Sequence, residues 1–251
     1  MLSRAKNIEQ IFLDSSFIPE KHLKVHEASL KEARRIDKEC IAEQLRNENY
    51  DIFLVNMRAS SNFKDVEKDP FAKHSSLVCL TQTCLEDNEG GFQWPGRRCM
   101  APASSGEGKG VCCITDEKQN TLFRTKLVTE KFQLIKVTMR DKFQIFIVYV
   151  SPNSNHQVYQ DIADAIEELL MPGLEPIIIG DFNFDAKEQN SVTSFLKVRN
   201  FLQLVDKPTH HEGRLIDHFY VSPPELKDIV DFTTMFKYYT DHTAFHVQIK
   251  N

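Results

Sequence analysis

Residues 177–183 place two polar side chains at the end of an apolar run. Three consecutive isoleucines predict a buried strand, which we expect to break at Gly180 and to present Asp181 and Asn183 at its mouth. A carboxylate and an amide at a strand end can orient a water molecule and neutralise an oxyanion.

Asp241 and His242 form a second pair of such groups near the C-terminus. They come directly before residues 243–249, whose apolar side chains alternate on one face of a predicted strand. Carboxylates and an imidazole at strand ends can also hold a divalent cation. The two segments together predict the chemistry of a metal-assisted hydrolase.

The composition fits one large domain, or one domain with a short extension. The chain has 251 residues, of which 41% are hydrophobic, so it can bury a sizeable core. We expect no transmembrane helix, because no apolar run reaches about 18 residues. The N-terminus lacks the apolar segment of a secretory signal peptide, and six cysteines without a C-x-x-C pair favour reduced thiols in an intracellular protein.

The net charge of −5 argues against a protein that grips nucleic acid through bulk electrostatics. It does not exclude a nuclease, because a bound cation compensates acidic residues locally. Lys187, Lys197, Arg199 and Lys207 are candidates for a basic groove, although scattered surface lysines are the commoner explanation.

From Tyr50 onward the apolar pattern alternates between strand and helix periods, which predicts an α/β fold. The expected strands cover residues 51–56, 76–82, 111–114, 142–150, 215–221 and 243–249, and the expected helices cover residues 158–169 and 192–202. The G-x-G-x-G run at 106–110 is no phosphate-binding loop, since a strand follows it rather than a helix. Its glycines are expected to permit a tight approach into that strand.

Four segments at predicted strand ends resemble, in chain order, signatures of the endonuclease/exonuclease/phosphatase superfamily and of its transposon branch in particular. They are Asn56-Met57-Arg58 for N-x-R, Leu80-Thr81-Gln82-Thr83 for L-T-E-T, Tyr149-Val150-Ser151-Pro152-Asn153 for Y-x-x-P-N, and Pro208-Thr209 with Ile216-Asp217-His218 for P-T…I-D-H. The G-D-x-N run that ends at Asn183 fits the same family. The resemblance spans about residues 50–251 and implies two packed mixed β-sheets flanked by helices, a four-layer α/β sandwich.

The resemblance also implies catalytic roles. Asp181 would orient or deprotonate the attacking water, and Asn183 would fix the phosphate and that water. Asp217 and His242 would form a dyad in which the carboxylate sets the tautomer of the imidazole.

Substrate contacts are implied for a further set of residues. Asn56 and Tyr149 would hydrogen-bond phosphate oxygens as part of the catalytic set, while Asn153, Arg58 and Thr209 would bind substrate.

The implied cofactor is Mg²⁺, or Mn²⁺, bound by Asp241 and by the residue at position 82. The family has glutamate at that position, whereas this chain has Gln82. An amide oxygen is neutral and is a poorer ligand for a hard cation than a carboxylate. An inactivating substitution, a decayed transposon copy and a natural variant with weak metal affinity all remain open.

Residues 1–48 carry a second resemblance, which sets the expected domain boundary before an endonuclease-type domain at 49–251. Residues 2–6 and 17–25 are similar to the end of the helicases of Helitron-type transposons. A fused helicase in a longer protein is therefore an expected partner.

Three functions stay open at this point. The first, which fits the motifs best, is a DNA endonuclease of a mobile element that nicks one strand, leaves a 3′-hydroxyl and acts in the nucleus. The second is a phosphatase on lipid, inositol or nucleotide phosphates, and the third is a catalytically silent DNA-binding module. Among the other histidines, His210, His211 and His218 could touch substrate or face solvent, and His246 is expected to be exposed.

Overall fold

The computed structural model describes residues 50–84, 92–100, 110–116, 121–139 and 142–250. The predicted extension at residues 1–48, with its helicase-like segments, lies outside these residues. The boundary at 48 and 49 therefore stays a prediction.

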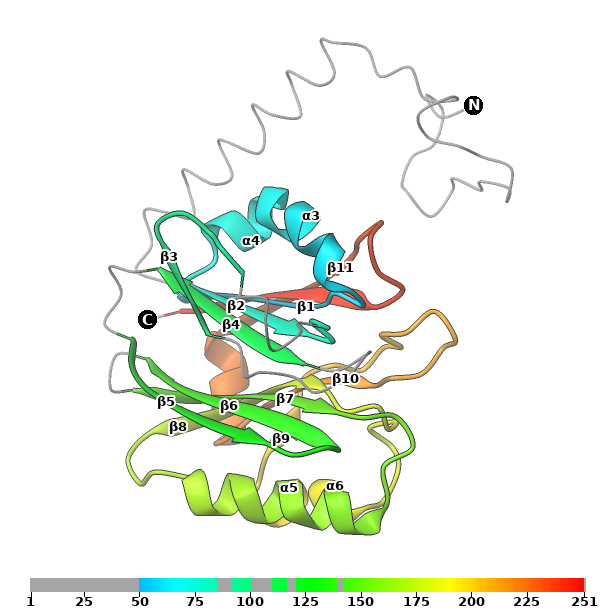
Figure 1. Cartoon of the computed structure of the whole chain (residues 1–251). Helices are drawn as coiled ribbons and strands as arrows, with labels where there is room; N and C mark the ends of the chain where they lie inside the picture. The colour runs from blue at the N-terminus through cyan, green and yellow to red at the C-terminus, as the bar shows by residue number, and fades with distance from the viewer. Residues whose placement is uncertain (1–49, 85–91, 101–109, 117–120, 140–141, 251) are drawn as a thin grey trace, which may run out of the picture. The chain divides into compact units, whose positions relative to one another are not determined.

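Two six-stranded mixed sheets pack face to face between two layers of helices (Figure 1). The first sheet has the order β11-β12-β1-β2-β4-β3, and the second has the order β5-β6-β7-β8-β10-β9. The described part of the chain confirms the predicted four-layer α/β sandwich.

The first sheet contains β1 (Tyr50–Asn56), β2 (Leu77–Thr81), β3 (Arg97–Met100), β4 (Val111–Asp116), β11 (Val230–Phe236) and β12 (Thr243–Ile249). The second contains β5 (Thr121–Val128), β6 (Phe132–Met139), β7 (Phe143–Val150), β8 (Glu175–Asp181), β9 (Leu202–Gln203) and β10 (Asp217–Val221). Two pairs are parallel, β1 with β2 and β7 with β8, and the other described pairs are antiparallel.

The helices are α3 (Phe63–Lys68) and α4 (Pro70–His74) on the first sheet, and α5 (His156–Leu169) and α6 (Ser191–Val198) on the second (Figure 1). Short 3₁₀ helices cover Ser60–Asn62 and Pro224–Ile229. Among the described residues, no helix has the length and apolar character needed to cross a membrane.

Alternation along each strand divides the core into an inner layer and two outer layers. In β8, Ile177 and Ile179 face the other sheet, whereas Ile178 packs under α5 and α6. On α5, Val158, Ile162 and Ile166 form the buried stripe that the helical period predicts. Because both faces of β8 are covered, its apolar run is continuous.

Gly180 does not break the strand, so that prediction is wrong. β8 continues through Asp181, and Gly180 has a φ of 153°. A β-carbon at Gly180 would lie 1.9 Å from the carbonyl oxygen of Val148 on the neighbouring strand. Glycine is therefore required here because the two backbones approach closely, and the strand delivers Asp181 as its last residue.

Gly110 has a similar role at the start of β4. Its φ is 121°, and a β-carbon there would lie 2.2 Å from Thr83 Oγ1. The expected tight approach into this strand is confirmed at Gly110, while Gly106 and Gly108 lie outside the described residues.

Gly180→Ala is expected to destabilise the domain by about 3 kcal/mol or more, because backbone strain and overpacking add at a site that cannot move. Urea unfolding followed by circular dichroism measures this loss. Gly173→Ala is the control, since a β-carbon there meets nothing within 4 Å although its φ of 84° is also positive. Equal losses in the two variants would contradict the close-approach explanation.

Candidate active site

Three polar side chains form a row across the end of the second sheet. Asp181 on β8 pairs in register with Tyr149 on β7 and with Asp217 on β10. Residues paired in register point to the same face, so all three lie on the inner face between the sheets. Each is only 1% exposed. The strand ends therefore bring together three residues that are far apart in the sequence.

Asp181 is held by two amide side chains. Asn56 Nδ2 donates to Asp181 Oδ2 at 2.8 Å, from the last residue of β1 on the opposite sheet. The backbone N–H of Asn183 donates to Asp181 Oδ1 at 3.0 Å, and Asn183 Nδ2 lies 3.3 Å from Oδ2. Asn183 Nδ2 also donates to the Val150 carbonyl at 2.8 Å, which fixes the Asn183 side chain against β7.

Asp217 and His242 form the expected dyad. His242 Nδ1 lies 2.7 Å from Asp217 Oδ2, and both side chains are buried. The contact leaves Nε2 of the imidazole as the nitrogen that can face a substrate or a metal.

Thr209 supports this dyad from the loop before β10. Its Oγ1 accepts hydrogen bonds from the backbone N–H groups of Asp217, at 2.9 Å, and Ile216, at 3.1 Å. Its carbonyl accepts from the N–H of Thr243 at 2.7 Å, directly after His242. These contacts position Asp217 and His242, whereas the predicted contact of Thr209 with substrate stays a prediction.

The buried charges shift one another's pKa values. Burial, together with the nearby Asp217 carboxylate, raises the pKa of Asp181 to about 7. Burial lowers the pKa of His242, but the charge of Asp217 and the hydrogen bond to it outweigh that effect and raise it to about 8. Burial and the charge of Asp181 raise the pKa of Tyr149, so its hydroxyl stays protonated. An acid–base pair poised near neutral pH is typical of active sites.

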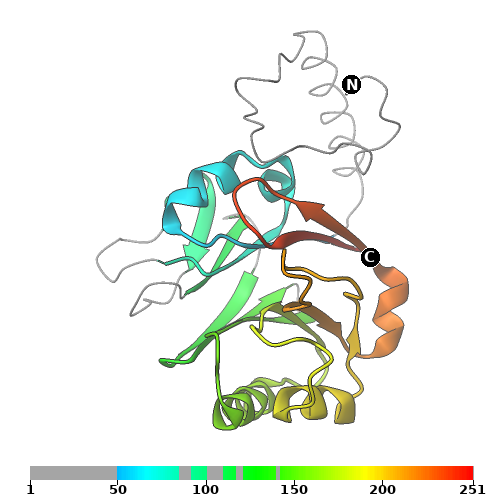
Figure 2. The same ribbon diagram turned by 90° about the vertical axis from the view of Figure 1, so that its right-hand side faces the viewer.

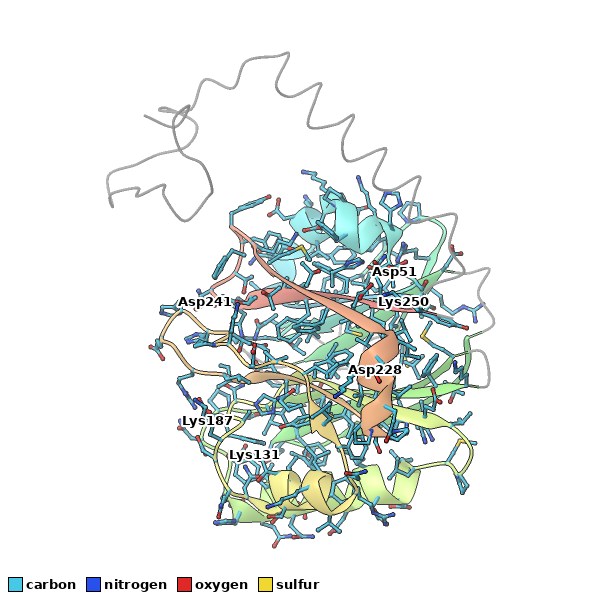
Figure 3. All side chains as sticks on the ribbon, turned by 180° about the vertical axis from the view of Figure 1, so that it is seen from behind. Asp51, Lys131, Lys187, Asp228, Asp241 and Lys250 are labelled. Carbon is cyan, nitrogen blue, oxygen red and sulfur yellow. The ribbon has the colours of Figure 1, made fainter. Side chains whose placement is uncertain are left out.

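The same residues can hold a cation. Ligand atoms of Asp181, Asp217 and His242 all lie within 4.8 Å of one another. Asp241 Oδ1 is buried without a hydrogen-bond partner among the described contacts. Figure 3 labels Asp241 on the same side of the molecule as the exposed Lys187. The carboxylates of Asp181 and Asp217 lie close enough together to raise the pKa of Asp181, and Asp241 Oδ1 lacks a hydrogen-bond donor among the described residues. A divalent cation would offset this negative charge, so the donor set fits one.

Gln82 follows β2 directly, next to the residue that pairs with Asn56. Thr81 is in register with Asn56, and Asn56 contacts Asp181. Gln82 is half-buried. The strand order therefore places position 82, where the motif resemblance implies a glutamate, beside the Asp181 cluster, with an amide in place of a carboxylate.

Positive φ angles gather at these strand ends. Arg58, Gln82, Asn153 and Asn183 have φ values of 62°, 50°, 56° and 52°. Left-handed backbone in residues other than glycine is costly, and it is concentrated at functional sites. Asn153 is exposed on the loop after β7, where a substrate could reach it.

Arg58 pairs with the predicted metal ligand Asp241. Its Nη1 lies 3.1 Å from Asp241 Oδ2, and its side chain is 55% exposed. Arg214, which the sequence interpretation did not single out, donates through Nη2 to the Asn183 carbonyl at 3.4 Å. Its place three residues before Asp217 was the only available signal. Arg58 lies beside the half-buried Asp241 carboxylate and Arg214 lies beside the backbone of Asn183, where each can also contact a phosphate.

Two histidines differ from the expectations. His218 is fully buried on β10 and faces away from Asp217, with its ring stacked 4.7 Å from Phe182. His246 is 6% exposed and lies 5.0 Å from the ring of Phe71 on α4, so its predicted exposure is wrong. Each lies on a strand face that helices cover.

His218 is expected to make the domain acid-sensitive. Burial lowers its pKa to about 4, from 6.5 in the unfolded chain, so the folded state favours the neutral ring. Its contribution is complete above pH 6.5 and is lost as the pH falls to about 4, at a cost of about 3 kcal/mol. The difference in urea-unfolding free energy between the wild type and His218→Gln, measured from pH 7 to pH 4, isolates this contribution. Parallel curves for the two proteins would contradict it.

No protein-family model matches the chain, and no curated protein matches it. Solved structures do match. The endonuclease domain of TRAS1, a telomere-specific non-LTR retrotransposon, has a TM-score of 0.60 and 16% identity over 80% of this chain and 98% of that domain. The 3′ phosphatase NExo from Neisseria, bound to a product DNA hairpin, has a TM-score of 0.63 and 12% identity over 80% and 99%. An endonuclease/exonuclease/phosphatase family protein from Leptotrichia buccalis has a TM-score of 0.58 and 14% identity over 80% and 100%. The chain therefore has the fold of the endonuclease/exonuclease/phosphatase proteins.

Proposed function

We propose that this chain is a Mg²⁺-dependent phosphodiester hydrolase that nicks DNA and leaves a 3′-hydroxyl. The observation that carries the proposal is the buried row of Tyr149, Asp181 and Asp217, completed by His242 on Asp217. The transposon-type motifs and the DNA-processing neighbours favour an endonuclease of a mobile element, acting in the nucleus. A helicase fused to it in a longer protein is part of the same proposal.

Asp181 is the proposed general base. A pKa near 7 lets it accept a proton from the attacking water at neutral pH. The water oxygen forms a bond to phosphorus, the bond from phosphorus to O3′ breaks, and O3′ takes up a proton from solvent to become the 3′-hydroxyl. Asn56 and Asn183 keep the carboxylate in place during this step.

His242 is proposed to stabilise the charge that develops on the phosphate. With a pKa of about 8, its ring is mostly protonated at pH 7, and Asp217 fixes its orientation. The hydroxyl group of Tyr149 donates a hydrogen bond to a phosphate oxygen. Arg58 and Asn153 bind neighbouring phosphates of the strand.

Mg²⁺ would be held by Asp241 and Gln82, close to the Asp181 carboxylate. When bound, it supplies positive charge that polarises the phosphate and stabilises the leaving oxygen. The neutral amide of Gln82 removes one ligand charge, so we propose that this chain binds the cation weakly and hydrolyses DNA slowly.

Nicking of supercoiled plasmid DNA in Mg²⁺, with and without EDTA, tests this function. We expect slow, EDTA-sensitive nicking whose products a DNA polymerase extends directly, because they carry a 3′-hydroxyl. Inositol and nucleotide phosphates run in parallel test the phosphatase alternative. Release of phosphate from these compounds without nicking would overturn the endonuclease proposal, and DNA binding without either reaction would favour the silent module.

A further inference from the structure

A second group of ligand atoms lies beside the proposed catalytic residues and is rich in nitrogen. His210, Asp241 and His242 each offer an atom within 4.8 Å of the others. His210 Nε2 lies 3.5 Å from Asp241 Oδ2, and His242 Nε2 lies 4.0 Å from Asp241 Oδ1. The sequence gives no reason to expect His210 as a metal ligand, because no local pattern shows that it lies beside Asp241.

The backbone holds these side chains together. His210 and His242 form an antiparallel β-bridge, and the N–H of His211 donates to the Asp241 carbonyl at 3.1 Å. Figure 2 shows the loop before β10, in orange, beside the start of β12, in red. The three ligands therefore come from two segments that hydrogen bonds already join.

Neighbouring groups leave the right atoms available. Nδ1 of His242 is hydrogen-bonded to Asp217, which leaves Nε2 available as a ligand. Carboxylates commonly orient metal-binding histidines in this way. Nδ1 of His210 accepts a hydrogen bond from the backbone N–H of Glu212 at 3.4 Å, so the proton of the neutral ring lies on Nε2, 3.5 Å from Asp241 Oδ2. A metal ion at Nε2 would shift that proton to Nδ1, which lies 3.7 Å from a Glu212 carboxylate oxygen. The buried Oδ1 of Asp241 has no hydrogen-bond partner among the described contacts.

We propose that His210, Asp241 and His242 form a binding site for a transition-metal ion such as Zn²⁺, which shares Asp241 with the Mg²⁺ site and differs from it in its two histidines. Two imidazole nitrogens and one carboxylate are ligands that Zn²⁺ takes readily, whereas Mg²⁺ requires oxygen. The three ligands leave a fourth position for water.

Two other cationic groups share the Asp241 carboxylate. Arg58 Nη1 lies 3.1 Å from Oδ2, and His211 Nδ1 lies 3.4 Å from the same atom. Both contact Oδ2, so Oδ1 stays available to a metal. Both side chains are more than half exposed and can move aside.

Zn²⁺ at this site would inhibit the reaction, an inference that rests on the proposed function. The ion occupies Nε2 of His242, the nitrogen that is proposed to face the phosphate. Because Mg²⁺ binds imidazole poorly, added Mg²⁺ would not displace it, whereas a chelator would.

Calorimetric titration with Zn²⁺ in excess Mg²⁺ tests the site without reference to activity. We expect His210→Ala to weaken binding at least about 10-fold. His211→Ala is the matched control and is expected to keep the affinity, since that ring is 60% exposed and contacts Asp241 only through Oδ2, the oxygen that Arg58 also contacts. Equal affinity of His210→Ala and the wild type would overturn the proposal.

Cysteine thiols are the competing ligands, because Cys99 and Cys112 have sulfur atoms 3.2 Å apart. Titration with Co²⁺ separates the two sites, since thiolate ligands add strong charge-transfer absorption that imidazole and carboxylate lack. We expect a spectrum without it, lost in His210→Ala. Thiolate absorption as the only signal would overturn the proposal.

Assays of DNA nicking with and without Zn²⁺ distinguish this inference from the proposed function. Zn²⁺ binding that depends on His210, in a protein that cleaves no DNA, would support the site and contradict the function. DNA nicking that Zn²⁺ inhibits equally in the wild type and His210→Ala would support the function and overturn the site.

Discussion

Gln82→Glu is expected to raise the rate of Mg²⁺-dependent DNA nicking at least about 10-fold, the lower end of what a change around a metal typically costs. The substitution replaces a neutral amide oxygen with a carboxylate, which a hard cation prefers. Position 82 follows the strand that pairs with β1 at Asn56, so the added charge lies beside the Asp181 cluster. The Mg²⁺ concentration that gives half the maximal rate should fall as well.

The fold should tolerate this change. Gln82 is half-buried at the end of β2, and no hydrogen bond of its side chain is described there. Gln189→Glu is the matched control, because it makes the same chemical change at an exposed position in the loop before α6. If Gln82→Glu binds Mg²⁺ more tightly but nicks DNA no faster than Gln189→Glu, the assignment of Gln82 as the limiting residue fails.

Asp181→Asn should lower the nicking rate by about 10²- to 10⁴-fold, the usual contribution of general base catalysis. The amide has nearly the same shape and can still accept from Asn56, but it cannot take a proton from water. Asp206→Asn, which neutralises an exposed carboxylate, is the control and should keep its rate. A loss of less than threefold in Asp181→Asn would contradict the role of general base.

Asp181→Asn should lower the nicking rate without lowering the folding stability of the domain. The pKa of Asp181 is about 7 in the fold and 3.8 in the unfolded chain, so the folded state favours the neutral carboxyl. Without a metal, the domain therefore loses stability as the pH rises from about 4 to about 7. At pH 8 the Asp181→Asn protein should unfold at a temperature equal to or above that of the wild type, and thermal unfolding in EDTA measures this. A lower unfolding temperature would indicate that Asp181 is structural.

The sequence predicted the strands that carry chemistry better than those that do not. Residues 51–56 and 243–249 match β1 and β12 closely, because the first is an apolar run that ends at a polar residue and the second alternates apolar and polar side chains. Strands β3, β5, β6, β9 and β11 and helices α3 and α4 were not predicted. β6 shows why: it buries Gln133, Lys136 and Thr138 between β5 and β7, and these polar residues interrupt the apolar pattern of a buried strand.

Side-chain environments were the harder part of the prediction. Alternation indicates that His218 and Asp217 lie on opposite faces of β10, but it cannot show that α5 and α6 cover the face of His218. The pairing of Arg58 with Asp241 joins residues 183 positions apart, and no local pattern records it. The strand-end pattern singled out Asp181 and His242 and the motif resemblance added Asp217, whereas the supporting contacts of Thr209 became visible only in three dimensions.

The most direct test of the central claim is plasmid nicking by Gln82→Glu compared with the double variant Gln82→Glu/Asp181→Asn, both in Mg²⁺. The single variant provides enough activity to measure, and the double variant removes the proposed base from the buried row. We predict EDTA-sensitive nicking by the single variant and none above background by the double variant. Equal nicking by the two proteins would contradict the claim that this row of strand-end residues is the hydrolytic centre.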